Sequence, residues 1–233
     1  MSEFENYGIG EREKAALKAT RIFRGLPQAE FEAALKRGFA RCARYGKGAT
    51  VAEAESRRAE FMVLLSGRIQ GVREQENGTQ DFVQLFVPGE ICGLDIVCSA
   101  TRRCPFRLQA LDETDLVFID YDAMFSGNIS HIAAQTLREG VTQALAGESL
   151  KRLHKIDVLY RRALRDRVWV YLWNLSVLTG SERVETNMDR EQFAQYLGVN
   201  RSALSHELSK MRADGLIDFS KSVFTILANY ERG

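Results

Sequence analysis

The 233-residue sequence contains no apolar run that approaches the ~18 residues of a membrane span. Its N-terminal stretch, MSEFENYGIGEREK, also lacks the apolar core of a secretory signal peptide. We therefore expect a cytoplasmic protein whose four cysteines are reduced by default. A nucleophile elbow, a P-loop and a metalloprotease helix are absent too, so we expect neither catalytic residues nor enzyme activity.

Residues that bind metals are scarce. The sequence has three scattered histidines, His131, His154 and His206, and this argues against haem or zinc. Cys92, Cys98 and Cys104 recur at intervals of six, which matches no compact ligand motif such as C-x-x-C. Thiolates do bind soft metals and oxidise reversibly, so redox or metal sensing is a hypothesis beside that of buried structural thiols.

Length and composition fit an ordinary globular chain of two domains, with 45% hydrophobic and 27% charged residues. The net charge of +1 gives no overall sign of a nucleic-acid partner. Basic residues are nevertheless concentrated between positions 151 and 167, where seven lysines and arginines stand against two aspartates. This basic segment could contact phosphates, and a solvated, partly salt-bridged helix surface explains it equally well.

Residues 189–217, DREQFAQYLGVNRSALSHELSKMRADGLI, have the spacing of two short helices joined by a tight turn. Asp189 and Gln192 have the form of a capping box, and Asn200 is placed to cap the second helix. The second helix has one apolar stripe, at Leu204, Leu208 and Met211. Its opposite face carries short or hydrogen-bonding side chains, which suit a helix laid in a major groove. The pattern predicts a helix-turn-helix.

Two strands are predicted after this motif. Gly215 ends the second helix, and residues 216–219 and 223–227 have strand character on either side of a turn at Ser220 and Lys221. We interpret this as a two-stranded wing. Upstream, a helical stripe with Trp169 and Trp173 alongside is interpreted as packing of the same domain.

The N-terminal half shows a different pattern. Residues 11–35 read as a helical lead-in that Leu26-Pro27 interrupts. Short strands follow at residues 61–65, 68–72, 82–87, 106–111 and 116–119, with a hairpin signal at Asn77-Gly78. Strands at this spacing predict an antiparallel sandwich or roll. A long helix follows residue 122, and we expect the domain junction near residues 156–160.

With its wing, the C-terminal segment resembles that of the Crp/Fnr superfamily of transcription regulators, the relatives of the cyclic-AMP receptor protein. LLSGRI at residues 64–69 and PGEICG at residues 88–93 are similar to the β-roll effector domain of that superfamily. The resemblance covers nearly the whole chain and implies an α+β fold. Its parts would be an antiparallel β-roll with a helical lead-in (1–122), a cyclic-nucleotide-binding-like double-stranded β-helix; a long dimerisation helix (123–157); and a winged helix-turn-helix (158–233).

The function implied by the resemblance is that of an effector-responsive, sequence-specific DNA-binding regulator that acts as a homodimer. Its partners would be a pseudo-palindromic double-stranded DNA and RNA polymerase. The residues expected at DNA are Arg190, Asn200, Arg201, Ser202, Ser205, His206 and Lys210. The family often has a glutamate and an arginine where this chain has Ser202 and His206, so we expect a different target sequence.

The effector is expected to be a small molecule bound between the roll and the long helix. The family's nucleotide-binding members use a glutamate for the ribose and an Arg-Ser or Arg-Thr pair for the phosphate. Here Leu94 occupies the glutamate position and Cys104-Pro105 the position of the pair, which disfavours cyclic AMP, although a shifted loop could use a nearby arginine. The candidate effector-binding residues are Gly89, Glu90, Gly93, Leu94, Arg102 and Arg103.

Apolar residues on the long helix can be buried by the chain's own roll, by the same helix of a second chain, or by both on adjacent faces. Parallel pairing predicts a dimer that reads half-sites about one DNA turn, ~34 Å, apart. The predicted interface consists of Ile129, Ile132, Thr136, Leu137, Val141, Ala144 and Leu145. Gly140 and Gly147 allow close backbone approach or bending, and the sequence does not distinguish the two.

Two alternative functions are retained. One is a ligand-binding regulatory protein that does not bind DNA. The other is a redox- or metal-sensing regulator that uses Cys92, Cys98 and Cys104. The family's oxygen-sensing members hold an iron–sulfur cluster with an N-terminal cysteine cluster, and this chain has no cysteine before Cys42, which disfavours such a cluster.

Overall fold

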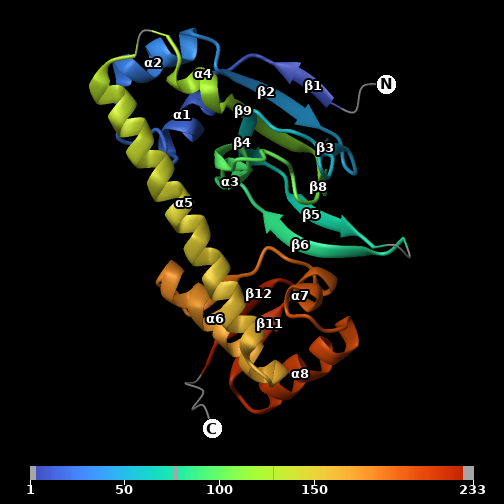
Figure 1. Ribbon diagram of the computed structural model, residues 1–233. Coiled ribbons are helices and arrows are strands. Elements are labelled where there is room, and N and C mark those ends of the chain that lie inside the picture. The colour runs from blue at the N-terminus through green and yellow to red at the C-terminus, as the bar shows by residue number, and fades with distance from the viewer. Residues whose placement is uncertain (1–3, 76–77, 128, 228–233) are drawn as a thin grey trace. The chain divides into compact units, whose positions relative to one another are not determined.

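The computed structural model describes residues 4–75, 78–127 and 129–227 (Figure 1). The chain forms two compact units, Met1–Gly147 and Glu148–Gly233. Within the described residues, no helix combines the length and the apolar character needed to cross a membrane. The fold is the predicted mixture of an N-terminal antiparallel β-unit, a long helix and a C-terminal helix-turn-helix unit.

The strands of the first unit are β1 (Phe4–Tyr7), β2 (Ala40–Tyr45), β3 (Thr50–Ala52), β4 (Glu60–Ser66), β5 (Ile69–Glu74), β6 (Gln80–Phe86), β7 (Ile91–Cys92), β8 (Arg107–Ala110) and β9 (Thr114–Asp120). They make two antiparallel sheets, in the orders β1-β2-β9-β4-β7 and β3-β8-β5-β6. The predicted β5–β6 hairpin is present, with Glu74 paired to Gln80; Asn77 lies outside the described residues. β1 was not predicted, because its short sequence FENY has no apolar alternation.

The central strands β4 and β9 of the five-stranded sheet are buried on both faces. In β4, Phe61 and Val63 point to the helices while Met62 and Leu64 point to the second sheet, and β9 alternates in the same way. Side chains on successive strand residues point to opposite faces, so a strand covered on both sides is apolar throughout. This explains why the apolar runs at residues 61–65 and 116–119 are continuous.

The helices of the first unit are α1 (Glu11–Ala19), α2 (Gln28–Lys36), α3 (Leu94–Cys98), α4 (Tyr121–Phe125) and the beginning of α5 (His131–Tyr160). The single helix predicted from residue 123 is therefore two. Gly127 has a positive φ of 79°, which interrupts the chain after α4, and the Ser130 hydroxyl then accepts a hydrogen bond from Ala133 N and begins α5. Figure 1 shows α5 as the longest helix, running on into the second unit.

The predicted dimer residues on α5 are divided by the structure. Leu137, Val141 and Ala144 are buried in the chain's own core, with Ile129 and Leu145 partly buried against it. Leu137, Val141 and Ala144 therefore contribute to the core within the chain, and a dimer contact by Ile129, Ile132, Thr136 and Leu145 stays a prediction. Of the predicted set, Ile132 alone is a strongly exposed large apolar residue, at 72%. Because one stripe of α5 is already covered, any partner must use another face of the helix.

Gly140 allows close approach of the backbone, which is one of the two roles that the sequence left open for this glycine. A Cβ placed there would lie 2.6 Å from Ile22 O and 2.7 Å from Ile22 Cα. At Gly147 the corresponding neighbour is the Arg21 guanidinium, at 2.5 Å from Nη1. The first contact is with main chain, which cannot swing away, whereas the second is with the far end of a flexible side chain.

We expect Gly140→Ala to destabilise the first unit by up to about 2 kcal/mol. Alanine would gain about 1 kcal/mol of helix propensity, but overpacking against a fixed backbone costs about 1–3 kcal/mol. Gly147→Ala is the matched control, in which the propensity gain should prevail because Arg21 can move. Urea unfolding of both variants measures the difference, and a Gly140→Ala protein as stable as Gly147→Ala would contradict the backbone contact.

The second unit contains the end of α5 together with α6 (Leu164–Thr179), β10 (Arg183–Glu185), α7 (Arg190–Tyr196), α8 (Arg201–Ala213), β11 (Ile217–Ser220) and β12 (Val223–Ile226). The wing predicted from the sequence is β11 and β12, and β10 adds a third strand in the order β10-β12-β11. β10 has only three residues and one buried side chain, so its sequence shows no detectable hydrophobic period. Trp169 is buried as expected, whereas Trp173 stacks on it with 38% of its surface exposed.

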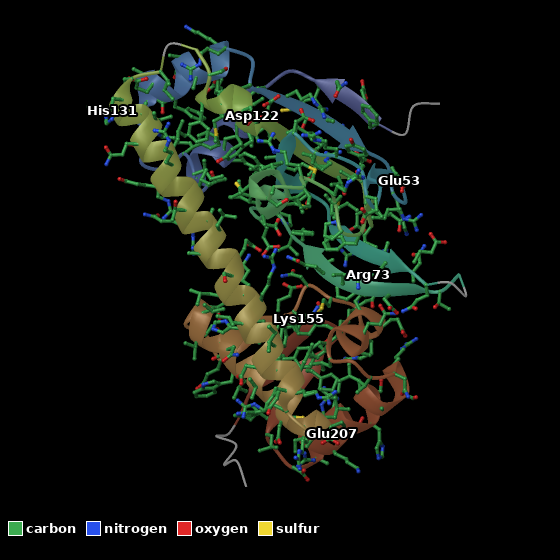
Figure 2. All side chains as sticks on the ribbon, viewed as in Figure 1. Glu53, Arg73, Asp122, His131, Lys155 and Glu207 are labelled. Carbon is green, nitrogen blue, oxygen red and sulfur yellow. The ribbon has the colours of Figure 1, made fainter. Side chains whose placement is uncertain are left out.

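The last turns of α5 pack on the helix-turn-helix, so the division of the chain falls earlier than residues 156–160. The Lys155 ammonium lies 4.8 Å from the centroid of the Tyr196 ring. Burial lowers the pKa of Lys155, which is labelled in Figure 2. The Arg167 guanidinium joins the residue after α5 to the turn of the motif, donating to Arg161 O at 2.8 Å and Leu197 O at 2.9 Å.

Candidate nucleic-acid interface and effector region

The ends of the two helices of the motif are capped as the sequence predicts. Gln192 N donates to Asp189 Oδ1 at 2.8 Å, and Asp189 N donates to Gln192 Oε1 at 3.1 Å, which completes a capping box. Asn200 Oδ1 accepts from Ala203 N at 2.8 Å at the start of α8. Gly198, with φ of 70°, supplies the left-handed residue that the turn needs. These local bonds fix where α8 begins.

α8 presents one polar face to solvent. Its apolar stripe, Leu204, Leu208 and Met211, is fully buried. The exposed side chains of the cap and helix that were predicted to contact DNA are Asn200, Arg201, Ser202, Ser205, His206 and Lys210. The structure therefore gathers six of the seven predicted residues on one accessible surface, which we call the α8 face.

Arg190, the seventh residue, has a different place. Its guanidinium lies 5.1 Å from the Phe219 ring centroid and donates to Lys221 O at 3.2 Å, so it holds α7 against the wing. Burial, together with the charges of Arg201 and Arg212, lowers the pKa of Arg190. Lys221, at the tip of the wing, is exposed and has a φ of 53°. From its sequence position Lys221 was interpreted only as a turn residue, although a positive charge between two strands of a wing also indicates a possible phosphate contact.

The basic segment at residues 151–167 is mostly engaged within its own unit. Arg165 forms ion pairs with Glu207 at 2.7 Å and Asp214 at 2.6 Å, and so ties α6 to α8 (Glu207 is labelled in Figure 2). Arg161 is paired with Asp157 at 2.5 Å, and Arg167 caps backbone carbonyls. These contacts favour the salt-bridged helix surface over a row of free phosphate ligands.

In the first unit, the candidate effector residues do not converge on one site. Gly93 has a φ of 82° in a tight turn, a conformation that favours glycine. Leu94, which follows it, is buried in the core and cannot replace a ribose-binding glutamate. Glu90 accepts a hydrogen bond from Val87 N at 3.1 Å within its own turn, where Gly89 has a φ of 88°. The glycines therefore shape the turn, and the side chains around them belong to the fold.

The two arginines of this region also diverge. Arg102 forms a bidentate pair with Asp122, with distances of 2.5 and 2.9 Å, and this contact raises the pKa of Arg102. Asp122 is labelled in Figure 2. Arg103 Nη1 donates to the backbone oxygen of Glu55 at 2.9 Å. Of these two arginines, Arg102 therefore has a carboxylate partner among the described residues and Arg103 does not.

The cysteines do not form a metal site in the described residues. Burial raises the pKa of Cys92 well above its usual value and also raises that of Cys104. Cys98 is exposed as a residue, but its thiol is partly buried, and this burial raises the pKa of Cys98. Thiolate is the form that binds metal and reacts with oxidants. No group of three or more histidine, cysteine or acidic side chains suited to a metal ion occurs in the described part of the chain.

Comparisons with known proteins agree with this architecture. The family model of the Crp-like helix-turn-helix domain matches residues 166–228, and that of the cyclic nucleotide-binding domain matches residues 42–126. The fumarate and nitrate reduction regulatory protein of Escherichia coli K12 is 22% identical over 190 residues, covering 78% of this chain and 73% of its own length.

Solved structures share the fold. A mutant of CooA from Carboxydothermus hydrogenoformans is similar with a TM-score of 0.65 and 17% identity, covering 83% of this chain and 86% of that one. FixK2 from Bradyrhizobium japonicum gives a TM-score of 0.63 and 16% identity, with coverage of 80% and 92%.

Proposed function

Because this chain belongs to the Crp/Fnr family of DNA-binding, effector-responsive transcription regulators, we propose that it binds a pseudo-palindromic DNA site as a homodimer through the α8 face. A small molecule bound to the β-roll unit would bias this binding. It can do so only by its different affinity for the two arrangements of the winged domains. A regulator of this kind acts where the chromosome is, so we place the protein in the cytoplasm, with RNA polymerase as a further partner.

The observation that best supports DNA binding is the contrast between the two sides of α8. One side is fully buried at Leu204, Leu208 and Met211, and the other exposes a row of short polar and basic side chains. A helix that lies in a major groove needs such a row, because base edges offer hydrogen-bond donors and acceptors. Lys210 on this face and Lys221 at the tip of the wing are both exposed, and they add charge for phosphate contacts that would position the helix.

Binding-site selection from random double-stranded DNA tests the proposal. We expect a pseudo-palindrome to be enriched, and its affinity to fall steeply with salt because lysine and arginine release counterions from the phosphates. The alternative of a regulatory protein without DNA binding predicts no enrichment. A selection that yields no preferred sequence under any effector condition would favour that alternative.

We expect Arg201→Ala to weaken specific binding by about 1–3 kcal/mol and to relax the preference at one base position, because an arginine can bind guanine through two hydrogen bonds. Arg201 is exposed at the first residue of α8. Lys210→Ala is the matched control: loss of a phosphate contact should weaken all sequences about equally. Selection experiments on both variants give the comparison, and an unchanged base preference in Arg201→Ala would reject this role.

Among possible effectors, a small molecule other than cyclic AMP is favoured, and a redox signal is disfavoured. Leu94 and Cys104 are buried where a cyclic nucleotide would need a carboxylate and a guanidinium. Cys92 and Cys104 are buried thiols with raised pKa values, which disfavours the redox- or metal-sensing alternative. Mass spectrometry of the protein isolated anaerobically under non-denaturing conditions distinguishes a metal cluster, a nucleotide and another ligand.

A further inference from the structure

Two short extended segments of the β-roll unit lie side by side and bring two arginines together. Arg58 N donates to Arg102 O at 2.8 Å, and Cys104 N donates to Ser56 O at 3.0 Å. These bonds enclose an antiparallel bridge in which Arg57 stands directly opposite Arg103. In a pair enclosed in this way the Cα atoms are about 4.5 Å apart and the side chains are neighbours on one face.

This arginine pair, Arg57 and Arg103, has no carboxylate partner among the described residues. The guanidinium of Arg57 makes neither an ion pair nor a hydrogen bond with them, and that of Arg103 donates only to the neutral backbone oxygen of Glu55. Like charges directly opposite each other destabilise a strand pair. A bound anion would offset repulsion between two positive charges placed in this way.

Three other arginines of the same unit have different surroundings. Arg102, next in sequence, is held by Asp122, and Arg68 is held by Asp112 at 2.6 Å. Arg73 stands opposite Asp81 in the β5–β6 register, so its cross-strand neighbour is an acid (Arg73 is labelled in Figure 2). Each of these three arginines has an acid beside it, which the arginine pair lacks.

We propose that Arg57 and Arg103 form a binding site for a phosphoryl group carried by a small molecule. The backbone register places these two side chains opposite each other, so both guanidinium groups can reach one anion and offer N–H donors in the planar geometry that phosphate oxygens accept. The inference rests on the proposed function in taking the ligand as the effector of a regulator. It differs from the family's phosphate subsite, whose positions are Cys104 and Pro105 here, because one guanidinium comes from the opposing segment.

Binding of inorganic pyrophosphate to the full-length protein tests the site. In calorimetric titrations at constant ionic strength, we expect saturable binding that Arg57→Ala and Arg103→Ala each weaken by about tenfold or more, because each removes one charge-assisted contact. Arg103→Lys keeps the charge but loses the planar fork, so its affinity should fall between wild type and Arg103→Ala. Arg73→Ala is the matched control and should bind pyrophosphate within about twofold of wild type.

Thermal unfolding without ligand shows whether the variants fold. Arg57→Ala should melt no lower than wild type, because it relieves a like-charge contact, while its stabilisation by pyrophosphate is lost. An equal loss of affinity in Arg73→Ala, or a wild-type response no larger than that to chloride at the same ionic strength, would overturn the inference.

DNA binding by the same proteins separates the two levels of the proposal. If the wild type binds its selected DNA but not pyrophosphate, the phosphoryl site is rejected and the DNA-binding regulator stands. If it binds pyrophosphate but no DNA sequence, the proposed function fails instead. If Arg57→Ala weakens DNA binding and leaves pyrophosphate binding unchanged, the arginine pair belongs to a nucleic-acid surface and the small-molecule site is overturned.

Discussion

A chain in which Leu150 and Leu153 are both replaced by glutamate is expected to be monomeric and to lose about 100-fold or more in affinity for a pseudo-palindromic site. Both leucines lie on α5 and each is 56% exposed. They share one side of the helix with other exposed apolar residues, Ile132, Ile156 and Tyr160. The opposite stripe of α5 is used within the chain, so this exposed stripe is the surface that a second α5 would cover.

The size of this effect follows from where the glutamates would lie. An uncompensated charge buried in an interface costs several kcal/mol, and the two substitutions place four such charges in one dimer. About 2.7 kcal/mol is already enough for a 100-fold change. A monomer would also bind one half-site instead of two. Sedimentation analysis reports the oligomeric state, and fluorescence anisotropy with the selected DNA reports affinity.

Leu178→Glu is the control for this prediction. Leu178 is 70% exposed on α6, so the substitution adds a charge to an equally accessible leucine away from α5. We expect this variant to dimerise and to bind DNA as the wild type does. A double α5 variant that remains a dimer would place the dimer interface elsewhere on the chain.

The parts of the fold that the sequence predicted are those whose causes are local. The capping box at Asp189, the Asn200 cap and the buried stripe of α8 all depend on residues a few positions apart. The spacing of the short strands predicted an antiparallel sandwich or roll, and burial on both faces explains the continuous apolar runs of β4 and β9.

The parts that the sequence did not predict depend on distant residues. Arg190 looked like a DNA ligand on its helix, but the ring of Phe219 and the oxygen of Lys221, about thirty residues later, hold it against the wing. A run of basic residues does not show where its acidic partners lie. Arg165 donates a hydrogen bond to Glu207, which is 42 positions away in the sequence. Likewise, the three-four spacing on α5 could not show which stripe the roll would cover.

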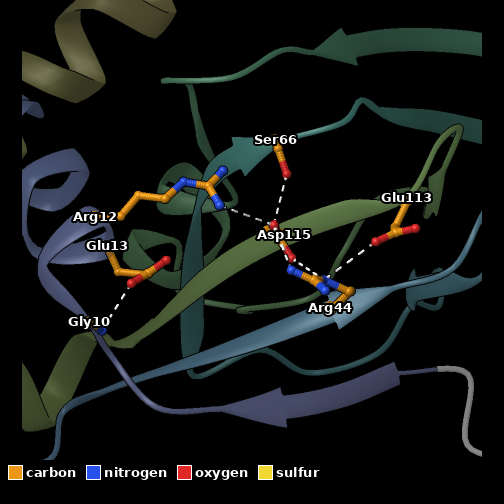
Figure 3. A network of polar contacts seen from close by, with 7 residues as sticks. All are labelled: Gly10, Arg12, Glu13, Arg44, Ser66, Glu113 and Asp115. Carbon is orange, nitrogen blue, oxygen red and sulfur yellow. Dashed lines mark hydrogen bonds and ion pairs between the residues drawn. The ribbon is translucent and has the colours of Figure 1, made fainter.

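Replacing Asp115 by asparagine is expected to lower the free energy of unfolding by about 2–3 kcal/mol at pH 7. Asp115 lies in β9 with only 7% of its side chain exposed, and it crosslinks the roll (Figure 3). Its carboxylate accepts from Arg44 Nε at 2.7 Å and from Ser66 Oγ at 3.0 Å, and Arg12 lies 3.6 Å away. An amide NH₂ in place of either oxygen would face an arginine N–H donor, and only the Ser66 hydroxyl could turn to accept a hydrogen bond from it.

Asp112 supplies a matched comparison. It accepts from Arg68 Nε at 2.6 Å and Nη2 at 3.2 Å, but its side chain is 41% exposed. Water therefore screens the pair and hydrates the arginine that is left behind, so Asp112→Asn should cost less than about 1 kcal/mol. Urea unfolding of the two variants at pH 7 measures the contrast, and equal losses would show that the burial of Asp115 contributes nothing.

The stabilisation by Asp115 should also depend on pH, with a sign fixed by its environment. The hydrogen bond from Arg44 holds the pKa of Asp115 below its ordinary value, against the opposing effect of burial. A carboxyl whose folded-state pKa is depressed stabilises the fold above its unfolded pKa of about 3.9 and loses that contribution as the pH falls through the folded value. The difference in unfolding free energy between wild type and Asp115→Asn should therefore be constant from pH 7 to about 5 and shrink below about 4. A difference that stays constant to pH 3 would mean that the carboxylate charge is not what Arg44 and Ser66 recognise.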